Sequence, residues 1–266
     1  MPFQLSDTKN ILVRHGLSPK DRLGQNFLVD APAAQSIVAS AGLHLKDAVV
    51  EVGAGLGALT RILAPQVRQV YAVESDSALI PILEENLSGV HNVEILNQNI
   101  LDFNPQSFNL SRYKIVGSIP YQITSPLIHR VLTLTTSPEL ATLVVQKEVA
   151  EKICAQVPDT NYLATFIISF AQAQIVKILK PASFYPQPKV DSAILKIQYS
   201  RKIPKDTDIA RWQKFLHHGF MQPRKMLNKR FDKEILEKAG IDPTRRAQTV
   251  SLEEWIKLFR SYNQHT

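Results

Sequence analysis

Short apolar runs recur along the first 200 residues of the chain, each bounded by polar or turn-forming residues. A run of this kind is typical of a buried strand, and the segments between the runs have helical character. The predicted strands lie near residues 48–52, 70–74, 93–96, 114–117, 141–146, 173–179 and 192–199. Strands that alternate with helices predict a parallel, doubly wound α/β sheet. The last two strands are close in sequence, so we expect an antiparallel hairpin to close the sheet.

The two ends of the chain depart from this alternation. A polar, basic arm precedes a helix predicted over residues 30–41, and residues 203–205 are interpreted as a linker. Helices are predicted beyond that linker, over residues 208–220, 223–238 and 251–262. We therefore expect two domains: residues 1–202, which include the N-terminal arm, and a small all-helical domain over residues 203–266.

A glycine-rich turn follows the first predicted strand. Gly53, Gly55 and Gly57 alternate with small or apolar residues before the sequence becomes helical. Glycines at such a turn let the backbone approach a ligand closely at a helix N-terminus. Their spacing is not the Gly-x-Gly-x-x-Gly of dinucleotide sites, which argues against hydride transfer. Glu74 ends the next strand about 20 positions later, where such folds bind ribose hydroxyls. The pattern predicts a nucleoside cofactor without a pyrophosphate.

A second candidate site follows the strand predicted over residues 114–117. Ser118 and Ile119 there supply a hydroxyl and a carbonyl that accept the N–H hydrogens of an exocyclic adenine amine, whose lone pair is otherwise delocalised into the ring. Pro120 biases Ile119 toward an extended conformation. Tyr121 offers its ring as a stacking surface for the base. The alternative interpretation is a strand end followed by a proline turn.

The distribution of charge is uneven. The chain carries 31 Lys and Arg against 24 Asp and Glu, a formal net charge of +7. Residues 201–266 hold 15 of the basic and 8 of the acidic residues, so the preceding 200 residues are neutral overall. An excess confined to one region is typical of a module that binds a polyanion. Within the helix predicted over residues 223–238, helical spacing places several cations on one side, and we predict that they bind RNA. These cations are Arg224, Lys225, Lys229 and Arg230. A solvated helical face is the alternative.

Composition excludes several other classes. No run approaches the ~18 uninterrupted apolar residues of a membrane span, and the N-terminus lacks the basic and apolar blocks of a signal peptide. The one cysteine, Cys154, excludes an intramolecular disulfide and a Cys-based zinc cluster. It is compatible with a reducing cytoplasm. We expect a cytoplasmic protein without a metal site or a membrane partner.

Six motifs in order make the chain resemble the ribosomal RNA adenine dimethyltransferase family, and within it the small-subunit dimethyladenosine transferases. They are Gly24-Gln-Asn-Phe-Leu28, Glu51-Val-Gly-Ala-Gly-Leu-Gly57, Val73-Glu74, Ser118-Ile-Pro-Tyr121, Gln146-Lys-Glu-Val149 and Phe184-Tyr-Pro-Gln-Pro-Lys-Val-Asp-Ser192. The resemblance spans about residues 14 to 260. It implies a class I, Rossmann-like S-adenosylmethionine-dependent methyltransferase that acts as a monomer. The implied reaction converts adenines of small-subunit ribosomal RNA to N6,N6-dimethyladenine on an immature subunit, as a step of ribosome maturation.

The resemblance also assigns roles to residues. The implied catalytic set places the ring of Phe184 on the target base opposite Tyr121, and it otherwise consists of the Ser118 to Tyr121 motif. The implied cofactor-binding set comes from the loops after several strands and from the N-terminal motif. It comprises Gln25, Asn26, Leu28, Gly53, Gly55, Glu74, Asn99, Ile100 and Ser118.

Two positions depart from the family pattern. Ser118 stands where Asn is usual, and Asn99 stands where Asp is usual. Asn99 keeps a carbonyl that accepts from the cofactor's adenine amine, and Ser118 keeps a hydroxyl acceptor. Two other functions stay open: an enzyme that modifies large-subunit RNA and confers antibiotic resistance, and an RNA- or DNA-binding factor on the same fold with weak or no catalysis.

Overall fold

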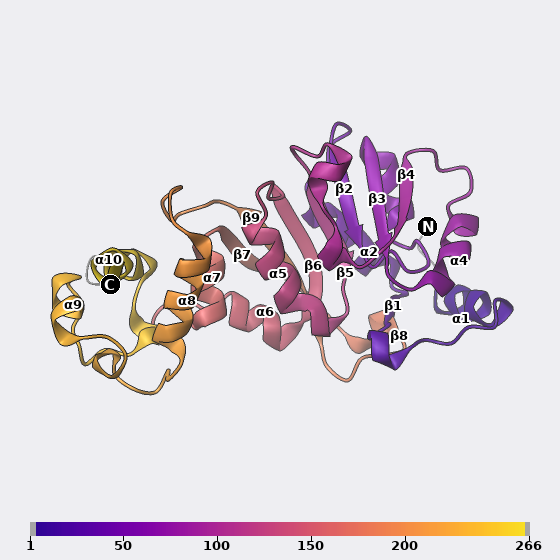
Figure 1. Ribbon diagram of the computed structural model, residues 1–266. Helices are drawn as coiled ribbons and strands as arrows, with labels where there is room; N and C mark the ends of the chain where they lie inside the picture. Colours follow the sequence, from indigo (N-terminus) through magenta and orange to yellow (C-terminus); the bar gives the residue numbers. More distant parts are fainter. Residues whose placement is uncertain (1–3, 264–266) are drawn as a thin grey trace. The chain divides into compact units, whose positions relative to one another are not determined.

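The computed structural model describes residues 4–263 and contains a seven-stranded sheet (Figure 1). Its order is β4-β3-β2-β5-β6-β9-β7. The strands are β2 (Ala48–Val52), β3 (Gln69–Glu74), β4 (Val93–Asn97), β5 (Lys114–Ser118), β6 (Leu140–Gln146), β7 (Ala171–Leu179) and β9 (Ser192–Tyr199). The first five are parallel to one another, and β9 is antiparallel to β6. All seven predicted strands are confirmed, as is the doubly wound character of the sheet.

The order of the strands fixes where a ligand can enter. The chain leaves β2 toward β3 and β4, then returns to the other side of β2 to form β5. The connections therefore diverge on either side of the β2–β5 pair. In open α/β sheets, ligands bind outside the carboxyl ends of the strands at such a switch point.

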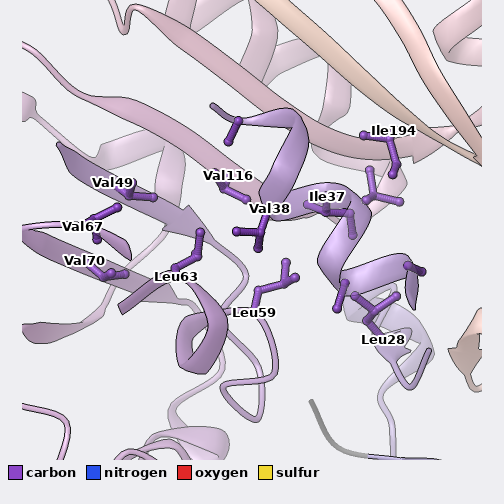
Figure 2. Close-up of a cluster of buried hydrophobic side chains, with 14 of the residues drawn as sticks. Leu28, Ile37, Val38, Val49, Leu59, Leu63, Val67, Val70, Val116 and Ile194 are labelled. Carbon is purple, nitrogen blue, oxygen red and sulfur yellow. The ribbon is translucent and has the colours of Figure 1, made fainter. Parts of the chain in front are cut away.

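One face of the sheet is covered by α2 (Ala31–Ser40) and α3 (Thr60–Leu63). Figure 2 shows apolar side chains of both helices, among them Val38 and Leu63, in one cluster with strand side chains such as Val116. Asp30 begins α2, because its carboxylate accepts a hydrogen bond from the Ala33 amide. The helix predicted over residues 30–41 is thus confirmed. α4 (Ile80–Asn86) covers the same face toward β4.

The opposite face carries aromatic residues and α5 (Thr124–Thr133). Side chains alternate along a strand, so Tyr71 points away from Val70 and toward this face. The Tyr71 ring packs edge-on against Phe108, with 5.1 Å between centroids, and Phe108 stacks on Phe103. Arg130 of α5 donates to the Phe103 carbonyl at 3.0 Å. Both faces are therefore buried, as parallel sheets require.

Two elements near the N-terminus lie outside the sequence prediction. The polar arm contains a helix, α1 (Leu5–Arg14), which buries Thr8, Ile11 and Leu12. The second is a two-stranded antiparallel sheet of β1 (Phe27–Leu28) and β8 (Phe184–Tyr185), which lie side by side in Figure 1. Segments more than 150 residues apart in sequence are joined there.

The chain divides into two compact units, and the division differs from the predicted boundary at residue 202. One unit comprises the residues up to Ala150 together with Gln174–Tyr199, and the other comprises Glu151–Ala173 with the residues from Ser200 on. Residues 151–173 belong with the C-terminal part because α7 (Tyr162–Ile168) and the residues after it pack on α8 (Ile209–Phe220). The buried Trp212 indole, for example, donates to the Ser169 hydroxyl at 3.1 Å.

The second unit is helical around an aromatic core. α10 (Leu252–Asn263) and α8 confirm two of the three predicted helices. Aromatic rings of these two helices and of the segment before α9 (Lys233–Lys238) contact one another with centroid separations between 5.1 and 6.3 Å. The rings belong to Trp212, Phe215, Phe231, Trp255 and Phe259. α6 (Lys147–Ile153) contains the end of one unit and the start of the other.

The helix predicted over residues 223–238 is wrong. Only α9 (Lys233–Lys238) and a short 3-10 turn, Leu227–Lys229, form there. The backbone before α9 pairs with the backbone near residues 245–246. The Leu227 amide donates to the Arg245 carbonyl at 2.8 Å, and Met226 forms a β-bridge with Arg246. Burial of the Leu227 side chain, which is 1% exposed, favours this pairing over a continuous helix.

Among residues 4–263, no helix combines the length and the apolar character that a membrane crossing requires. Within the same range, no group of three or more His, Cys, Asp and Glu side chains is placed to hold a metal ion.

Candidate cofactor and amine-binding site

A cavity of about 330 Å³ lies at the carboxyl ends of the parallel strands, at the switch point between β2 and β5. Its wall contains every residue predicted for catalysis or cofactor binding. They are Gln25, Asn26, Leu28, Gly53, Gly55, Glu74, Asn99, Ile100, Ser118, Ile119, Pro120, Tyr121 and Phe184. The fold thus brings together motifs that are spread over about 160 positions of the sequence.

Glu74 at the end of β3 is held by backbone amides. Its Oε2 atom accepts from the Gly55 amide at 2.9 Å, and its Oε1 atom accepts from the Asp76 amide at 2.8 Å. Burial raises the pKa of Glu74, and the hydrogen bonds from Asp76 and Gly55 oppose that rise only in part. The glycine turn and the acidic residue, which lie about 20 positions apart in the sequence, therefore form one rigid corner of the cavity.

Glu51 also lines the cavity, and it is not among the residues predicted for the site. The side chain is 1% exposed, and no hydrogen-bond partner reaches its Oε2 atom. Burial raises the pKa of the carboxyl group to about 8, with Thr60 beside it opposing the rise. The sequence does contain a signal for a functional Glu51, because this acidic residue lies inside the otherwise apolar strand Ala48–Val52. Burying an unpaired carboxyl group costs free energy, so such a residue is expected to have a function.

The predicted amine-binding motif follows β5 directly. Gly117 there pairs with Val52 of β2, and a Cβ atom at position 117 would lie 2.5 Å from the Val52 carbonyl oxygen. Only glycine allows this approach, which brings Ser118 beside the glycine turn. The Ile119 amide donates to the Val144 carbonyl at 3.4 Å, and Ser118 itself is half-buried on the cavity wall.

Tyr121 is oriented by a residue from another motif. Its hydroxyl lies 2.8 Å from that of Ser192, the first residue of β9, which is fully buried. The half-buried Tyr121 ring lines the cavity. Burial raises the pKa of the phenol, and the hydrogen bond with Ser192 opposes the rise.

Asn99 and Ile100 contribute to the wall after β4. The Asn99 Oδ1 atom accepts from the Leu101 amide at 3.0 Å, so it caps the short turn that follows. Ile100 is 7% exposed and presents an apolar surface. Because a carbonyl oxygen accepts two hydrogen bonds, the cap leaves one lone pair of Asn99 for a ligand.

The N-terminal motif reaches the cavity through different contacts from those predicted. Both polar ends of the Gln25 side chain are engaged within the protein: Oε1 accepts from the Lys20 amide at 2.8 Å, and Nε2 donates to Asp76 at 2.7 Å. Asn26 donates to the Gly24 carbonyl at 3.1 Å. Leu28 is buried and pairs with Phe184 in the β1–β8 sheet.

Phe184 lines the cavity as an element of the core. Its side chain is 2% exposed and packs in the cluster that also contains Leu28 and Ile194. Stacking of this ring on a base stays a prediction.

The four cations predicted to bind RNA do not share one helix. Arg224, Lys225 and Lys229 are exposed, whereas Arg230 is half-buried. The Arg230 guanidinium donates to the His218 carbonyl at 3.0 Å and contacts the His218 ring nitrogen Nδ1 at 2.9 Å. Arg230 thus ties the end of α8 to the following segment, while the other three side chains extend into solvent.

The cavity fits S-adenosylmethionine chemically. The group carries a positive sulfonium and an ammonium, and Glu51 is a buried acidic residue in the cavity wall whose ionised form would complement such a cation. Glu74, Ile100 and Leu28 also line the cavity, where a carboxylate would suit ribose hydroxyls and apolar surface would suit a purine. The strand order, the glycine turn and this cavity define a Rossmann-like, S-adenosylmethionine-dependent methyltransferase fold with a helical C-terminal part.

Comparisons with known proteins give the family. The chain belongs to the ribosomal RNA adenine dimethylase family, whose model matches residues 16–264. It is 36% identical over 275 residues to ribosomal RNA small subunit methyltransferase A of Dehalococcoides mccartyi strain CBDB1, covering 98% of this chain and 94% of the relative. The protein of the same name from Clostridium botulinum strain ATCC 19397 is 35% identical over 269 residues, covering 95% of this chain and 97% of the relative.

Solved structures agree with this assignment. The 23S rRNA methyltransferase ErmE superposes with a TM-score of 0.74 at 29% identity, covering 90% of this chain and all of that one. A dimethyladenosine transferase from Plasmodium falciparum superposes with a TM-score of 0.77 at 24% identity, covering 89% and 97% of the two chains. The second likeness is one of fold alone.

Proposed function

We propose that this protein dimethylates the N6 amine of adenines in small-subunit ribosomal RNA, with S-adenosylmethionine as methyl donor, during ribosome maturation. One observation carries the proposal: a single cavity is lined both by the Gly53–Gly55 turn with Glu74 and by the Ser118 to Tyr121 motif. A methyl donor and an acceptor amine held on these two walls are brought within reach of each other, which is the main contribution of an enzyme to such a transfer.

The residues of the chain have separate tasks in this reaction. The bound cofactor supplies an electrophilic methyl group. The Ser118 hydroxyl and the Ile119 carbonyl accept the two N6 hydrogens, which draws the amine toward a tetrahedral geometry and frees its lone pair. Tyr121 stacks on the adenine and keeps the amine in line with the methyl group. The amine becomes strongly acidic on alkylation, so its proton leaves after transfer.

Glu51 does not act as the base in this scheme. Because its pKa is raised to about 8, the carboxyl group of the ligand-free protein is protonated at neutral pH. A positive charge of the bound cofactor beside this group would lower its pKa and favour the ionised carboxylate. Two successive transfers require the monomethylated base to rotate or to rebind in the cavity.

The similarity to curated relatives favours the small subunit as the substrate. The relatives named for small-subunit RNA are 35% and 36% identical over nearly the whole chain, whereas ErmE, named for 23S RNA, is 29% identical. Primer extension on both ribosomal RNAs tests the choice, after expression in a host that lacks its own enzyme. Stops in the small-subunit RNA alone are expected, and stops confined to the large-subunit RNA would contradict the proposal.

Ser118 and Asn99 leave a binding factor as the second candidate, because both differ from the usual family residues. Transfer of labelled methyl groups from S-adenosylmethionine to immature small subunits separates the two functions. We expect two methyl groups for each modified adenine. Binding of the subunit without any incorporation of label would favour the binding factor.

We infer that the second unit contacts the RNA. It contains 16 Lys and Arg against 10 Asp and Glu, and the segment from Ile209 to Phe231 has six cations and no acidic residue. Phosphate neutralisation by such a segment supplies affinity without reading sequence. The proposal places the protein in the cytoplasm as a monomer on the immature subunit.

A further inference from the structure

The segment of residues 20–28, here called the strap, is fastened at both ends and lines the cavity. Its first residue, Lys20, forms an ion pair with Asp76, with 2.8 Å from the ammonium nitrogen to each carboxylate oxygen. Its last two residues pair with β8 in the two-stranded sheet. Between these ends, residues Leu23 to Leu28 line the cavity.

The middle of the strap packs on the predicted amine-binding motif. Gly24 adopts a φ of +61°, and a Cβ atom there would lie 2.8 Å from the Gln122 side-chain oxygen and 3.3 Å from the Pro120 Cβ atom. The side-chain nitrogen Nε2 of Gln122 donates to the Arg22 carbonyl at 3.3 Å. A displacement of the strap therefore reaches Pro120 and Gln122, the two neighbours of Tyr121 in the chain.

Asp76 is the anchor of this arrangement. The carboxylate is 6% exposed and accepts from Lys20, from Gln25 at 2.7 Å and from the Ala78 amide at 3.2 Å. A buried carboxylate is tolerated only when it is paired and hydrogen-bonded in this way. The Asp76 amide also donates to Glu74, so the anchor of the strap and the predicted ribose ligand are adjacent and connected.

We propose that Asp76, through Lys20 and Gln25, is a positioning residue that holds the strap against the cavity, and that cofactor retention and alignment of the target amine depend on this ion pair. Gln25 then acts through Asp76 and Lys20 and makes no direct contact with the cofactor. The part that concerns the target amine rests on the proposed function, whereas the part that concerns the cofactor does not.

The experiment compares Lys20→Met, Asp76→Asn and the conservative Lys20→Arg with wild type. Arg112→Met is the matched control, because it breaks the exposed Arg112–Glu139 ion pair just before β5, at the opposite end of the sheet. Calorimetry measures the dissociation constant of S-adenosylhomocysteine, and hydrogen exchange measures protection of residues 20–28. Single-turnover methylation of immature small subunits gives the rate and its dependence on cofactor concentration.

Removal of the charged hydrogen bonds should raise the dissociation constant about tenfold or more in Lys20→Met and Asp76→Asn. Exchange should accelerate in residues 20–28 and stay unchanged in β2. The cofactor concentration that gives half of the maximal single-turnover rate should rise more than that maximal rate falls, and Lys20→Arg should restore both affinity and protection. Arg112→Met should behave as wild type.

The inference is overturned if folded Lys20→Met and Asp76→Asn retain wild-type affinity and wild-type protection of the strap, or if Arg112→Met causes the same changes. Its failure is distinct from failure of the proposed function. If wild type methylates small subunits and the variants keep wild-type affinity and protection, only the proposed role of the strap is contradicted. A second outcome is that wild type binds S-adenosylhomocysteine but methylates no ribosomal RNA, while Lys20→Met has reduced affinity and protection. That outcome supports the role of the strap and contradicts the proposed function.

Discussion

The hydroxyl groups of Tyr121 and Ser192 lie 2.8 Å apart, which joins the last residue of the amine-binding motif to the first residue of β9. The two positions are 71 residues apart in sequence. Ser192 is fully buried and paired with Gln146 of β6, so it is a fixed point against which the Tyr121 ring is oriented. Preorganisation of a stacking ring in this way reduces the cost of ordering it when the base binds.

Removing this hydrogen bond should slow methylation modestly, while removing the ring should slow it strongly. Tyr121→Phe and Ser192→Ala each lose about 0.5–1.5 kcal/mol of positioning, at most roughly a tenfold change in rate. Tyr121→Ala also loses stacking worth about 1–3 kcal/mol. Single-turnover rates on immature small subunits provide the measurement. In the double variant Tyr121→Phe/Ser192→Ala the effects should not add, because both remove the same hydrogen bond; full additivity would contradict the pairing.

Ser118 offers the sharpest test of the chemistry. Ser118→Ala removes one of the two acceptors for the N6 hydrogens, so the methylation rate should fall by about one to three orders of magnitude. The affinity for S-adenosylmethionine should change much less, because the proposed role of this hydroxyl is to accept a hydrogen of the target amine. Ser118→Asn introduces the usual family residue and should retain or raise activity. An equally fast Ser118→Ala enzyme under single-turnover conditions would refute the role of this hydroxyl.

Glu74 should dominate recognition of the ribose. Glu74→Ala removes charge-assisted hydrogen bonds to its hydroxyls and should weaken binding of S-adenosylmethionine by about 1.5–3 kcal/mol. The same change releases the Gly55 amide, which donates to Glu74 at 2.9 Å. Calorimetry checks the affinity, with circular dichroism as the control for folding. Unchanged affinity in a folded variant would exclude Glu74 from the cofactor site.

The raised pKa of Glu51 makes the stability of the ligand-free protein depend on pH. The folded pKa is about 8 against an ordinary value of 4.5, so the unfolded chain releases a proton in that interval that the folded protein keeps. The stability that the folded protein gains by keeping the Glu51 carboxyl group protonated is fully present below pH 4.5 and is lost as pH rises through about 8. The free energy of unfolding of wild type should therefore fall relative to that of Glu51→Gln, by at most about 1.4 kcal/mol per pH unit.

Denaturant unfolding of the two proteins at about pH 5, 7 and 8.5 measures this difference. The stability of Glu51→Gln relative to wild type should increase with pH and level off above about pH 8. Parallel pH profiles of the two proteins would show that Glu51 titrates near its ordinary value, contrary to its burial in the cavity.

Charge removal on the second unit should weaken RNA binding and its salt dependence together. Neutralising the three exposed cations Arg224, Lys225 and Lys229 should lower the slope of log K against log salt by about 0.7–0.9 for each phosphate that the protein no longer neutralises. Binding of S-adenosylhomocysteine should stay the same. Arg230 is left intact because its hydrogen bonds with His218 hold the local backbone.

The control for that experiment removes the same number of charges elsewhere. Lys46, Arg68 and Arg112 are exposed and lie just before β2, β3 and β5, at the end of the sheet away from the cavity. Their neutralisation should leave the salt slope nearly unchanged. Equal slopes for wild type and for the variant at Arg224, Lys225 and Lys229 would mean that these cations contact no phosphate.

The seven strands and three of the four helices for which bounds were predicted follow from local pattern, because largely apolar runs such as Ala48–Val52 can be buried in few ways other than as strands of a parallel sheet. The glycine turn and Ser118 to Tyr121 carry their chemistry in the residues themselves, so they too were predictable. The helix expected over residues 223–238 was not, because the pairing of Met226 with Arg246 overrides local propensity.

Local pattern is therefore enough to predict the parallel sheet and the residues around its switch point. Which of these residues contact one another depends on the folded chain. The anchoring of Lys20 and Gln25 on Asp76, the contact of Tyr121 with Ser192 and the isolation of Glu51 from any partner for its Oε2 atom all depend on packing between distant segments. Local pattern records the propensity of a segment and the chemistry of a side chain, whereas burial, hydrogen-bond partners and shifted pKa values arise only when the chain closes around the cavity.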